Sequence, residues 1–258
     1  MNVVLLQHTP EPEKSVALAA RLCYSPTSLG ELREKLSATD IRSFLEKIMS
    51  LGHQSVLEHA SFTFGIEGIS RTTSHQLVRH RLASFSQQSQ RYVSHTKRFA
   101  AVIPDTVLDL PEARELFEKE LAAQHDAYTR LVAMGIPAED ARYILPNATE
   151  TKIMVTMNAR ELLHFFAVRC CERAQWEIRA MAIEMLRLVR PLAQTIFGQA
   201  GPGCLSGPCP EGTMTCGRMV EVRERFKNLV GATGRSHLQR RHPEDIHGKN
   251  KHRRPSGH

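Results

Sequence analysis

The chain has 258 residues, of which 41% are hydrophobic and 24% charged, and its formal net charge is +7. This size is enough for one large buried core with appendages, and no apolar run approaches the roughly 20 residues of a membrane span, so we expect no membrane protein. Residues 231–258 carry seven Lys/Arg and two Asp/Glu, so the rest of the chain is only about +2, and specific nucleic-acid binding is not expected of it.

In the first half of the chain, the spacing of apolar residues predicts two strands and three helices. Gly52 is expected in a left-handed conformation after the second helix, and Ser70 is expected to cap the third. Residues 53–59 are interpreted as a polar connection and residues 83–90 as a loop. The expected elements are a strand over 2–7, a helix over 11–24, a helix over 41–49 capped by Thr39-Asp40, a strand over 61–69, and a helix from Ser70 to about Leu82.

In the second half, helical spacing predominates. The helix over 174–197 is expected to bend near Pro191, because proline lacks a backbone donor. From Gly198 onward, Gly and Pro oppose regular structure, and residues 231–258 are expected to be disordered. The expected elements are a helix over 111–134, a helix opened by Pro137 that ends before Pro146, a strand over 149–157, and helices over 158–171, 174–197 and 221–229.

The segment from Arg79 to Arg91 is rich in hydrogen-bond donors and has no acidic residue. It reads R-H-R-L-A-S-F-S-Q-Q-S-Q-R. A guanidinium presents five fixed donors that suit phosphate oxygens. The alternative is a helix end favoured by cations, followed by a solvated loop. The functional interpretation is an oxyanion clamp, in which Ser89 and Arg91 hold one phosphate while Arg79 and Arg81 face another.

A second polar cluster runs from His53 to His59 with the sequence H-Q-S-V-L-E-H. Taken alone it is an ordinary polar loop. Its two histidines and Glu58 are conceivable zinc ligands, although their spacing matches no zinc motif.

A third cluster combines Arg142 with polar residues along and just after the predicted helix over 158–171; these are Asn158, Arg160, His164, Arg169 and Arg173. Arg169 and Arg173 are four residues apart, so they share a helix face that needs an anion or a carboxylate nearby. Glu172 and Glu177 are the alternative, structural partners. Because no Gly-rich nucleotide motif is present, phosphate binding would depend on side chains. We expect the three clusters to converge in space on two phosphorylated ligands.

The six cysteines, at positions 23, 170, 171, 204, 209 and 216, are expected to be reduced. The first residues show no charged leader, which predicts a cytoplasmic location, where disulfides are rare. Cys204, Cys209 and Cys216 could bind zinc together with a histidine of the tail such as His237. Their spacing lacks a C-x-x-C pair, so we assign no metal site.

Together, the clusters resemble the flavin-dependent thymidylate synthases, the thymidylate-synthase-complementing family. The matching stretches are Gly52-His53-x-Ser55-x-x-Glu58-His59, the segment from Arg79 to Arg91, Asn158-Ala159-Arg160, and Arg169 followed by Ala174-Gln175-Trp176-Glu177-Ile178. The resemblance covers about residues 1–200. It implies an α+β fold with a central antiparallel sheet flanked by helices. Residues 1–200 would be the catalytic domain, 201–230 a Gly/Pro/Cys-rich extension, and 231–258 a basic tail.

The resemblance implies the reductive methylation of dUMP to dTMP in dTTP biosynthesis. Methylene-tetrahydrofolate would donate the carbon, NADPH would reduce FAD, and the reduced flavin would donate the hydride. The family is a homotetramer with active sites shared between subunits. The alternative class is a basic nucleic-acid-binding protein that uses residues 79–91 and the tail. Its aromatic content of 6% provides few stacking platforms for that role.

The resemblance also implies roles for individual residues. The expected flavin contacts are Ser55, Glu58, Arg79, His80, Arg81, Gln87, Asn158, Arg160 and His164. The expected dUMP contacts are Gln76, Arg79, Gln87, Ser89, Gln90, Arg91, Arg142 and Arg169. The catalytic candidates are Arg169, Ser89 and His53. Arg169 would stabilise negative charge that develops on the uracil ring, as a fixed cation should, and His53 would lie near the flavin and the pyridine or folate site.

Three positions depart from the pattern of the family. Gln87 stands where other members carry an acidic residue, His164 where Asn is common, and Arg173 where some members have His. Ser89 has no adjacent base to activate it, so a hydrogen-bonding role is expected instead of a nucleophilic one. Cys170-Cys171 are interpreted as small core residues, and we therefore expect catalysis without a covalent Cys–substrate adduct.

Overall fold

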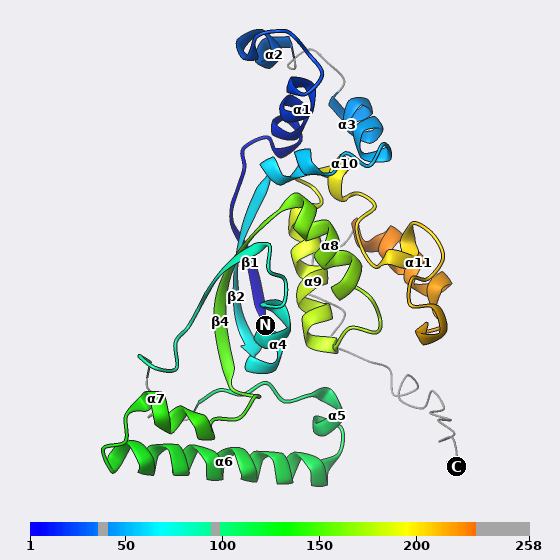
Figure 1. Ribbon diagram of the computed structural model, residues 1–258. Coiled ribbons are helices and arrows are strands. Elements are labelled where there is room, and N and C mark those ends of the chain that lie inside the picture. The colour runs from blue at the N-terminus through cyan, green and yellow to red at the C-terminus, as the bar shows by residue number, and fades with distance from the viewer. Residues whose placement is uncertain (36–40, 94–98, 231–258) are drawn as a thin grey trace, which may run out of the picture.

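The computed structural model describes residues 1–35, 41–93 and 99–230. Four antiparallel strands form one sheet, in the order β1-β2-β4-β3. Their bounds are Asn2–His8 for β1, Ser61–Ser70 for β2, Ala83–Gln87 for β3 and Glu150–Asn158 for β4. The sheet and its surrounding helices confirm the predicted α+β class with a central antiparallel sheet (Figure 1). The expected cap at Thr39-Asp40 and the expected disorder of residues 231–258 lie outside the described residues.

Eleven α-helices and several short 3-10 helices surround or extend the sheet in the described part of the chain. None of these helices is both long enough and apolar enough to cross a lipid bilayer. The α-helices are α1 (Pro12–Leu22), α2 (Leu29–Lys35), α3 (Ile41–Ser50), α4 (Arg71–Leu77), α5 (Asp105–Leu108), α6 (Pro111–Ala133), α7 (Ala138–Ala141), α8 (Ala159–Arg169), α9 (Trp176–Val189), α10 (Gln194–Phe197) and α11 (Met219–Lys227). The 3-10 helices used below are η2 (Ser55–His59), η3 (Arg142–Ile144) and η4 (Gly203–Leu205).

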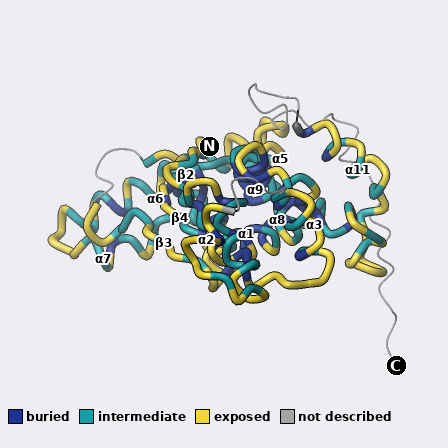
Figure 2. Tube along the Cα trace, turned by 90° about the horizontal axis from the view of Figure 1, so that it is seen from above, coloured by how far each residue is buried: buried dark blue, intermediate teal, exposed yellow. Residues whose placement is uncertain are grey.

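The core lies between one face of the sheet and helices α8 and α9. Alternation along β2 and β4 turns Phe62, Phe64 and Val155 inward, where they are fully buried. Phe165 and Phe166 of α8 are buried against them in the same cluster. Burying each such side chain contributes about 1.5–3 kcal/mol. Figure 2 shows that buried segments concentrate around α8 and α9, whereas α6, in which only Tyr128 is buried, lies at the periphery.

The other face of the sheet is open. Val4, Leu6 and Met154 point to this side and are 40%, 57% and 44% exposed. No described helix covers this face in Figure 1, where α8 and α9 lie on the opposite side. The open face is therefore a partly apolar surface of the single chain.

Two predictions around residues 77–90 were wrong. The predicted helix to Leu82 ends at Leu77, so Arg79-His80-Arg81 follows α4 instead of lying on its last turn. Residues 83–87 form strand β3 instead of a loop and pair with β4. Ser84 and Ser86 alternate with partly buried residues, so the two serines hid a strand pattern by being polar on its outer side.

The predicted helix over 174–197 is interrupted, not merely bent. Helix α9 ends at Val189 and α10 begins at Gln194, with Pro191 between them. The carboxylate of Glu13, from α1, accepts hydrogen bonds from the backbone N–H groups of Thr195 (2.5 Å) and Ile196 (3.3 Å). A residue distant in sequence therefore supplies the cap that starts a new helix at this point. Helices α2 and α5 were not predicted.

Candidate active site

A hydrogen-bonded network of three polar side chains connects the segment after α4 to helix α8. His80 is 6% exposed, and its Nδ1 lies 2.9 Å from Glu161 Oε1. Arg169 Nε donates a hydrogen bond to His80 Nε2 over 3.1 Å. Because arginine has no acceptor atom, Nε2 must be the unprotonated nitrogen and Nδ1–H must donate to Glu161. His80 is thus a neutral bridge between a carboxylate and a guanidinium.

The helical period of α8 positions two of the three side chains of this network. Asn158 caps the helix by accepting a hydrogen bond from Glu161 N at 2.9 Å. Glu161, Phe165 and Arg169 are spaced by four residues, so they share one helix face. His80 contacts all three, with Phe165 edge-on at 4.9 Å between ring centroids. One regular helix therefore fixes where the guanidinium of Arg169 lies.

The electrostatic environment keeps His80 neutral and leaves Arg169 cationic. Burial lowers the pKa of His80 below 6.5; Glu161 opposes this shift, and Arg169 reinforces it. Burial also lowers the pKa of Arg169, and the nearby charge of Arg79 lowers it further. An arginine remains cationic at neutral pH despite such a shift. The site therefore presents a fixed, partly desolvated positive charge beside a neutral imidazole.

We expect the stability of the chain to fall as the pH drops below about 6.5, because the unfolded His80 then gains a proton that the folded His80 resists. One such group changes the free energy of unfolding by at most about 1.4 kcal/mol per pH unit. Urea unfolding at pH 7.5 and 5.5 should show a smaller pH difference for His80→Gln than for the wild type. His75→Gln, at an exposed position of α4, is the control and should retain the wild-type difference. Equal pH differences in the wild type and His80→Gln would contradict the assignment.

The same region contains a cluster that could be mistaken for a metal site. One donor atom each from His80, Glu161 and His164 lies within 4.8 Å of the others. Both nitrogens of His80 are already engaged, however, and the cation of Arg169 lies directly beside it. A second positive charge would be repelled there, so the arrangement favours an anionic ligand.

The side chains of Arg79 and Arg81 supply further donors. Both residues are exposed, and neither side chain makes a hydrogen bond or ion pair within the described part of the chain. Neither Glu172 nor Glu177 serves as the partner of Arg169: Glu172 pairs with other arginines, and Glu177 accepts hydrogen bonds from the N–H and hydroxyl of Ser70. The structural alternative for Arg169 is therefore not realised. These unpaired guanidiniums have the donor chemistry that a pyrophosphate requires.

The residues of the second sequence cluster lie at the beginning of α8. Arg160 forms an ion pair with Glu58 of η2 at 2.5 Å, and both side chains are nearly half-exposed. His53 is exposed and packs edge-on against Tyr24, with ring centroids 5.8 Å apart. Ser55 is the first residue of η2 and is also exposed. This group borders the His80 region through α8, and its role as flavin contacts stays a prediction.

The remaining predicted residues gather at the far end of β3. Arg91 pairs with Glu139 at 2.5 Å, and Arg142 Nε donates to the carbonyl of Glu139 over 3.0 Å. Ser89 Oγ accepts a hydrogen bond from Arg91 N at 3.1 Å. Gln87 Nε2 donates a hydrogen bond to Thr151 Oγ1 at 3.2 Å, and Gln90 makes no polar side-chain contact within the described chain. Gln76 lies apart from this group, on α4, where its backbone carbonyl accepts a hydrogen bond from Arg169 Nη2 at 3.3 Å.

In the single chain the predicted residues fall into two groups at opposite ends of β3, and their convergence on two ligands stays a prediction. β3 has five residues, so its ends are roughly 14 Å apart. Arg79 and Arg81 precede one end of it, and Ser89 and Arg91 follow the other. Strand β3, which was predicted as a loop, therefore separates the two parts of the predicted oxyanion clamp.

Two residues of the site were missed in the sequence. Glu161 had a usable signal, because an Asn followed three residues later by Glu is a capping pattern. Arg71 had none: it lies near Arg142, and its Nη1 reaches the carbonyl of Gln88 only because α4 begins beside the end of β3. A cavity of ≈ 280 Å³ lies elsewhere, between α6 and the segment before α5, and it contains none of the predicted residues.

The protein has an α+β fold, and its α8 helix carries a fixed cation whose chemistry suits an anionic ligand. Residues 4–193 match the family described as thymidylate synthase complementing protein. The chain is 66% identical over 230 residues to the flavin-dependent thymidylate synthase of Geobacter sulfurreducens, covering 89% of this chain and 99% of that protein. It is 46% identical to the enzyme of that name from Clostridium tetani (87% and 96% covered) and 43% identical to that of Pyrococcus horikoshii (89% and 98%). The chain belongs to the thymidylate synthase complementing protein family.

Proposed function

We propose that this chain is a flavin-dependent thymidylate synthase that methylates dUMP to dTMP in the cytoplasm. In this proposal methylene-tetrahydrofolate donates the carbon and NADPH is the reductant. When bound, FAD supplies the hydride that completes the methyl group. The observation that carries the proposal is the guanidinium of Arg169, held by a neutral His80 and unpaired with any carboxylate among the described residues.

Arg169 acts on the pyrimidine in this proposal. A uracil ring that loses a proton or accepts a carbon electrophile develops negative charge on its ring atoms. Arg169 is fixed before the reaction, by His80 Nε2 at 3.1 Å and by the carbonyl of Gln76 at 3.3 Å. A donor that needs no reorganisation stabilises such charge best, particularly where water is partly excluded. His80 and Glu161 are then positioning residues, because they act through Arg169.

The residues around α8 fit a flavin dinucleotide. Arg79 and Arg81 would bind its pyrophosphate, and His164, Asn158, Ser55 and the Glu58–Arg160 pair would border it. The fit rests on donor chemistry: two guanidiniums without carboxylate partners, next to the polar N-terminus of a capped helix. His53 would lie near the flavin and the pyridine or folate site.

The predicted dUMP contacts at the far end of β3 are separated from Arg169 of the same chain. They would complete the site around an Arg169 if they came from another subunit. We therefore include in the proposal a homotetramer with shared active sites, in which Gln87, Ser89, Gln90, Arg91 and Arg142 act on the dUMP bound beside another copy's Arg169. The open face of the sheet, with Val4, Leu6 and Met154, supports association. Exposed Leu116 on α6 supports it as well.

A covalent cysteine adduct is not part of the proposal. Cys170, the residue next to Arg169, is fully buried, and burial raises the pKa of its thiol. A buried thiol of raised pKa is a poor nucleophile. Cys171 and the remaining cysteines of the C-terminal segment line a different cavity.

The proposal is tested by the colour and turnover of the purified chain. Flavin absorbance that is bleached by NADPH and altered by dUMP, together with dTMP formation that requires methylene-tetrahydrofolate, is the expected result. A colourless protein that binds no added FAD and forms no dTMP would refute it. Salt-sensitive retention on nucleic acid without turnover would favour the nucleic-acid-binding alternative.

We expect Ser89→Ala to retain measurable dTMP formation with weaker dUMP binding. Its hydroxyl accepts a hydrogen bond from Arg91 N, and no histidine or carboxylate contacts it within the described chain, so it has no base. Loss of one neutral hydrogen bond should raise KM for dUMP by about tenfold or less. Steady-state kinetics separate KM from kcat. Complete loss of turnover with intact dUMP binding would reinstate Ser89 as a nucleophile.

A further inference from the structure

Four of the six cysteines line one small cavity outside the site described above. Cys171, at the turn between α8 and α9, meets Cys204, Cys209 and Cys216 of the Gly/Pro-rich segment there. The cavity measures ≈ 10 Å³, about the space of a single water-sized sphere. Burial raises the pKa of Cys204, and the neighbouring thiols of Cys209, Cys171 and Cys216 raise it further, as expected for four thiols that line one cavity.

The fourth thiol could not be found by spacing. Cys204, Cys209 and Cys216 suggested a site that lacked one ligand, and the tail residue His237 lies outside the described residues. Cys171 lies more than thirty positions earlier in the chain and comes to the cavity because the turn after α8 packs against the segment around η4. Four cysteine ligands form the closed set typical of structural zinc sites.

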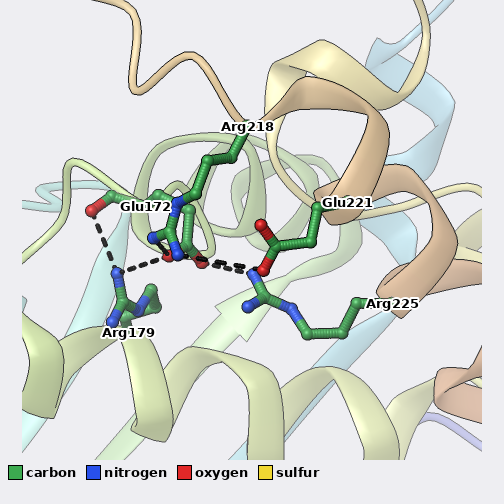
Figure 3. Close-up of polar contacts among 5 residues, drawn as sticks. All are labelled: Glu172, Arg179, Arg218, Glu221 and Arg225. Atoms are coloured by element: carbon green, nitrogen blue, oxygen red, sulfur yellow. Dashed lines mark hydrogen bonds and ion pairs between the residues drawn. The ribbon is translucent and has the colours of Figure 1, made fainter. Parts of the chain in front are cut away.

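Ionic contacts hold the two cysteine-bearing segments together. Figure 3 shows the carboxylate of Glu172, the residue after Cys171, contacted by Arg179 of α9 and by Arg218 and Arg225 near α11. The Glu172 side chain is only 4% exposed. Arg218 lies two residues after Cys216, so the Glu172 contacts bring Cys171 and Cys216 close. These ionic contacts do not involve the cysteine side chains, which stay available as ligands.

The backbone of the same segment is also fixed. Arg223 donates hydrogen bonds to the carbonyls of Cys204 (2.8 Å) and Gly207 (2.6 Å). Gly201 has φ 151°, and a side chain there would approach a ring atom of Phe226 to 2.8 Å, so the chain needs glycine at this point to pack against α11. The surrounding arginines would also offset the net charge of −2 that four thiolates and one divalent cation carry.

We propose that Cys171, Cys204, Cys209 and Cys216 form a binding site for a single Zn²⁺ ion. Tetrahedral coordination at Zn–S distances of about 2.3 Å requires sulfur atoms about 3.8 Å apart. Among the described residues no three of these sulfurs lie mutually within 4.8 Å, so binding turns the side chains inward. Each thiol gives up its proton on binding, and the four sulfurs then donate electron pairs to the ion without any redox change. The ion would join the C-terminal segment to the turn that follows Arg169.

The site is tested on the full chain with zinc analysis and with Co²⁺ as a spectroscopic probe. We expect one thiolate-bound ion per chain and, with Co²⁺, the intense visible d–d absorption of a tetrahedral thiolate complex at wavelengths longer than the flavin bands. Co²⁺ held by histidines and water without thiolate gives only the weak d–d absorption of an octahedral complex, so binding to the histidines of the tail would not imitate this signal. Cys209→Ser and Cys216→Ser should lose this absorption and bind Zn²⁺ at least about tenfold more weakly in a chelator competition.

Cys23→Ser is the matched control, because Cys23 is exposed at the end of α1, away from the cavity. It should retain the cobalt spectrum and the zinc content of the wild type. Cys209 and Cys216 lie in irregular, partly exposed chain, so their variants should keep the wild-type far-UV circular dichroism even if Cys171→Ser does not fold. The proposal is overturned if the wild type shows no thiolate–cobalt bands, if Cys209→Ser keeps them, or if the purified chain contains iron and acid-labile sulfide at this site.

Discussion

Replacing Arg169 with alanine is expected to lower kcat for dTMP formation by about 10²–10³-fold, the effect of removing one preorganised charge-stabilising donor. Flavin binding should be largely retained, because Arg79 and Arg81, the proposed contacts of the pyrophosphate, remain. Arg169 is the only cation in contact with the buried His80 among the described residues, and it is oriented by two acceptors before substrate arrives. Single-turnover kinetics with flavin absorbance measure both quantities on one sample.

The control for this experiment is Arg33→Ala on α2, an exposed arginine far from α8 in the fold, which should leave both quantities unchanged. Arg169→Lys should recover little of the lost rate, because an ammonium cannot reproduce the guanidinium fork that contacts His80 and Gln76 at once. His80→Gln should lower kcat more than it raises KM if His80 acts through Arg169. Wild-type turnover in Arg169→Ala would remove the central assignment.

Glu172→Gln is expected to lower the free energy of unfolding by about 3 kcal/mol, since removal of one partner from a buried ion cluster leaves uncompensated charge. Burial alone would raise the pKa of this carboxyl, but Arg179, Arg225 and Arg218 outweigh it, and the pKa lies below 4.5. The carboxylate therefore stabilises the fold at neutral pH, and this contribution is lost as the pH falls through its depressed pKa. Urea unfolding at pH 7 measures the difference.

Glu118→Gln is the matched control on α6, where Glu118 pairs with Arg114 at 2.8 Å but both side chains are about half-exposed. Such a surface pair is worth no more than about 1 kcal/mol. If Glu172→Gln has the fluorescence and the urea m-value of the wild type, the variant has the same folded structure and the difference measures its stability. A loss below that of the control would mean that the arginines around Glu172 are compensated by solvent.

The elements that the sequence predicted well are those whose apolar period is uninterrupted. Strand β2 alternates Phe62, Phe64 and Ile66 inward, and its predicted bounds of 61–69 differ from the observed ones by one residue. The long helix α6 begins at Pro111 as expected. Strand β3 was missed because its outward positions are serines, and the break before α10 was missed because its cap comes from Glu13, a contact that exists only after folding.

For the site, the residue types and their chemistry were predictable, but their grouping was not. The acid-free segment from Arg79 to Arg91 indicated anion binding, and the unpaired state of Arg79 and Arg81 agrees with it. The segment is divided between two locations because β3 runs between its halves, which no spacing rule in the sequence reveals. The assignment of individual residues to flavin or dUMP stays a prediction, as does the division of the chain at residues 200 and 230.

The equal spacing of Glu161, Phe165 and Arg169 along α8 sets the position of the Arg169 guanidinium relative to His80. An α-helix turns by about 100° per residue. A single residue inserted between Phe165 and Arg169 would rotate the guanidinium away from the imidazole, although no amino acid of the site would be lost. This helix should therefore tolerate exchanges of amino acid far better than changes of length.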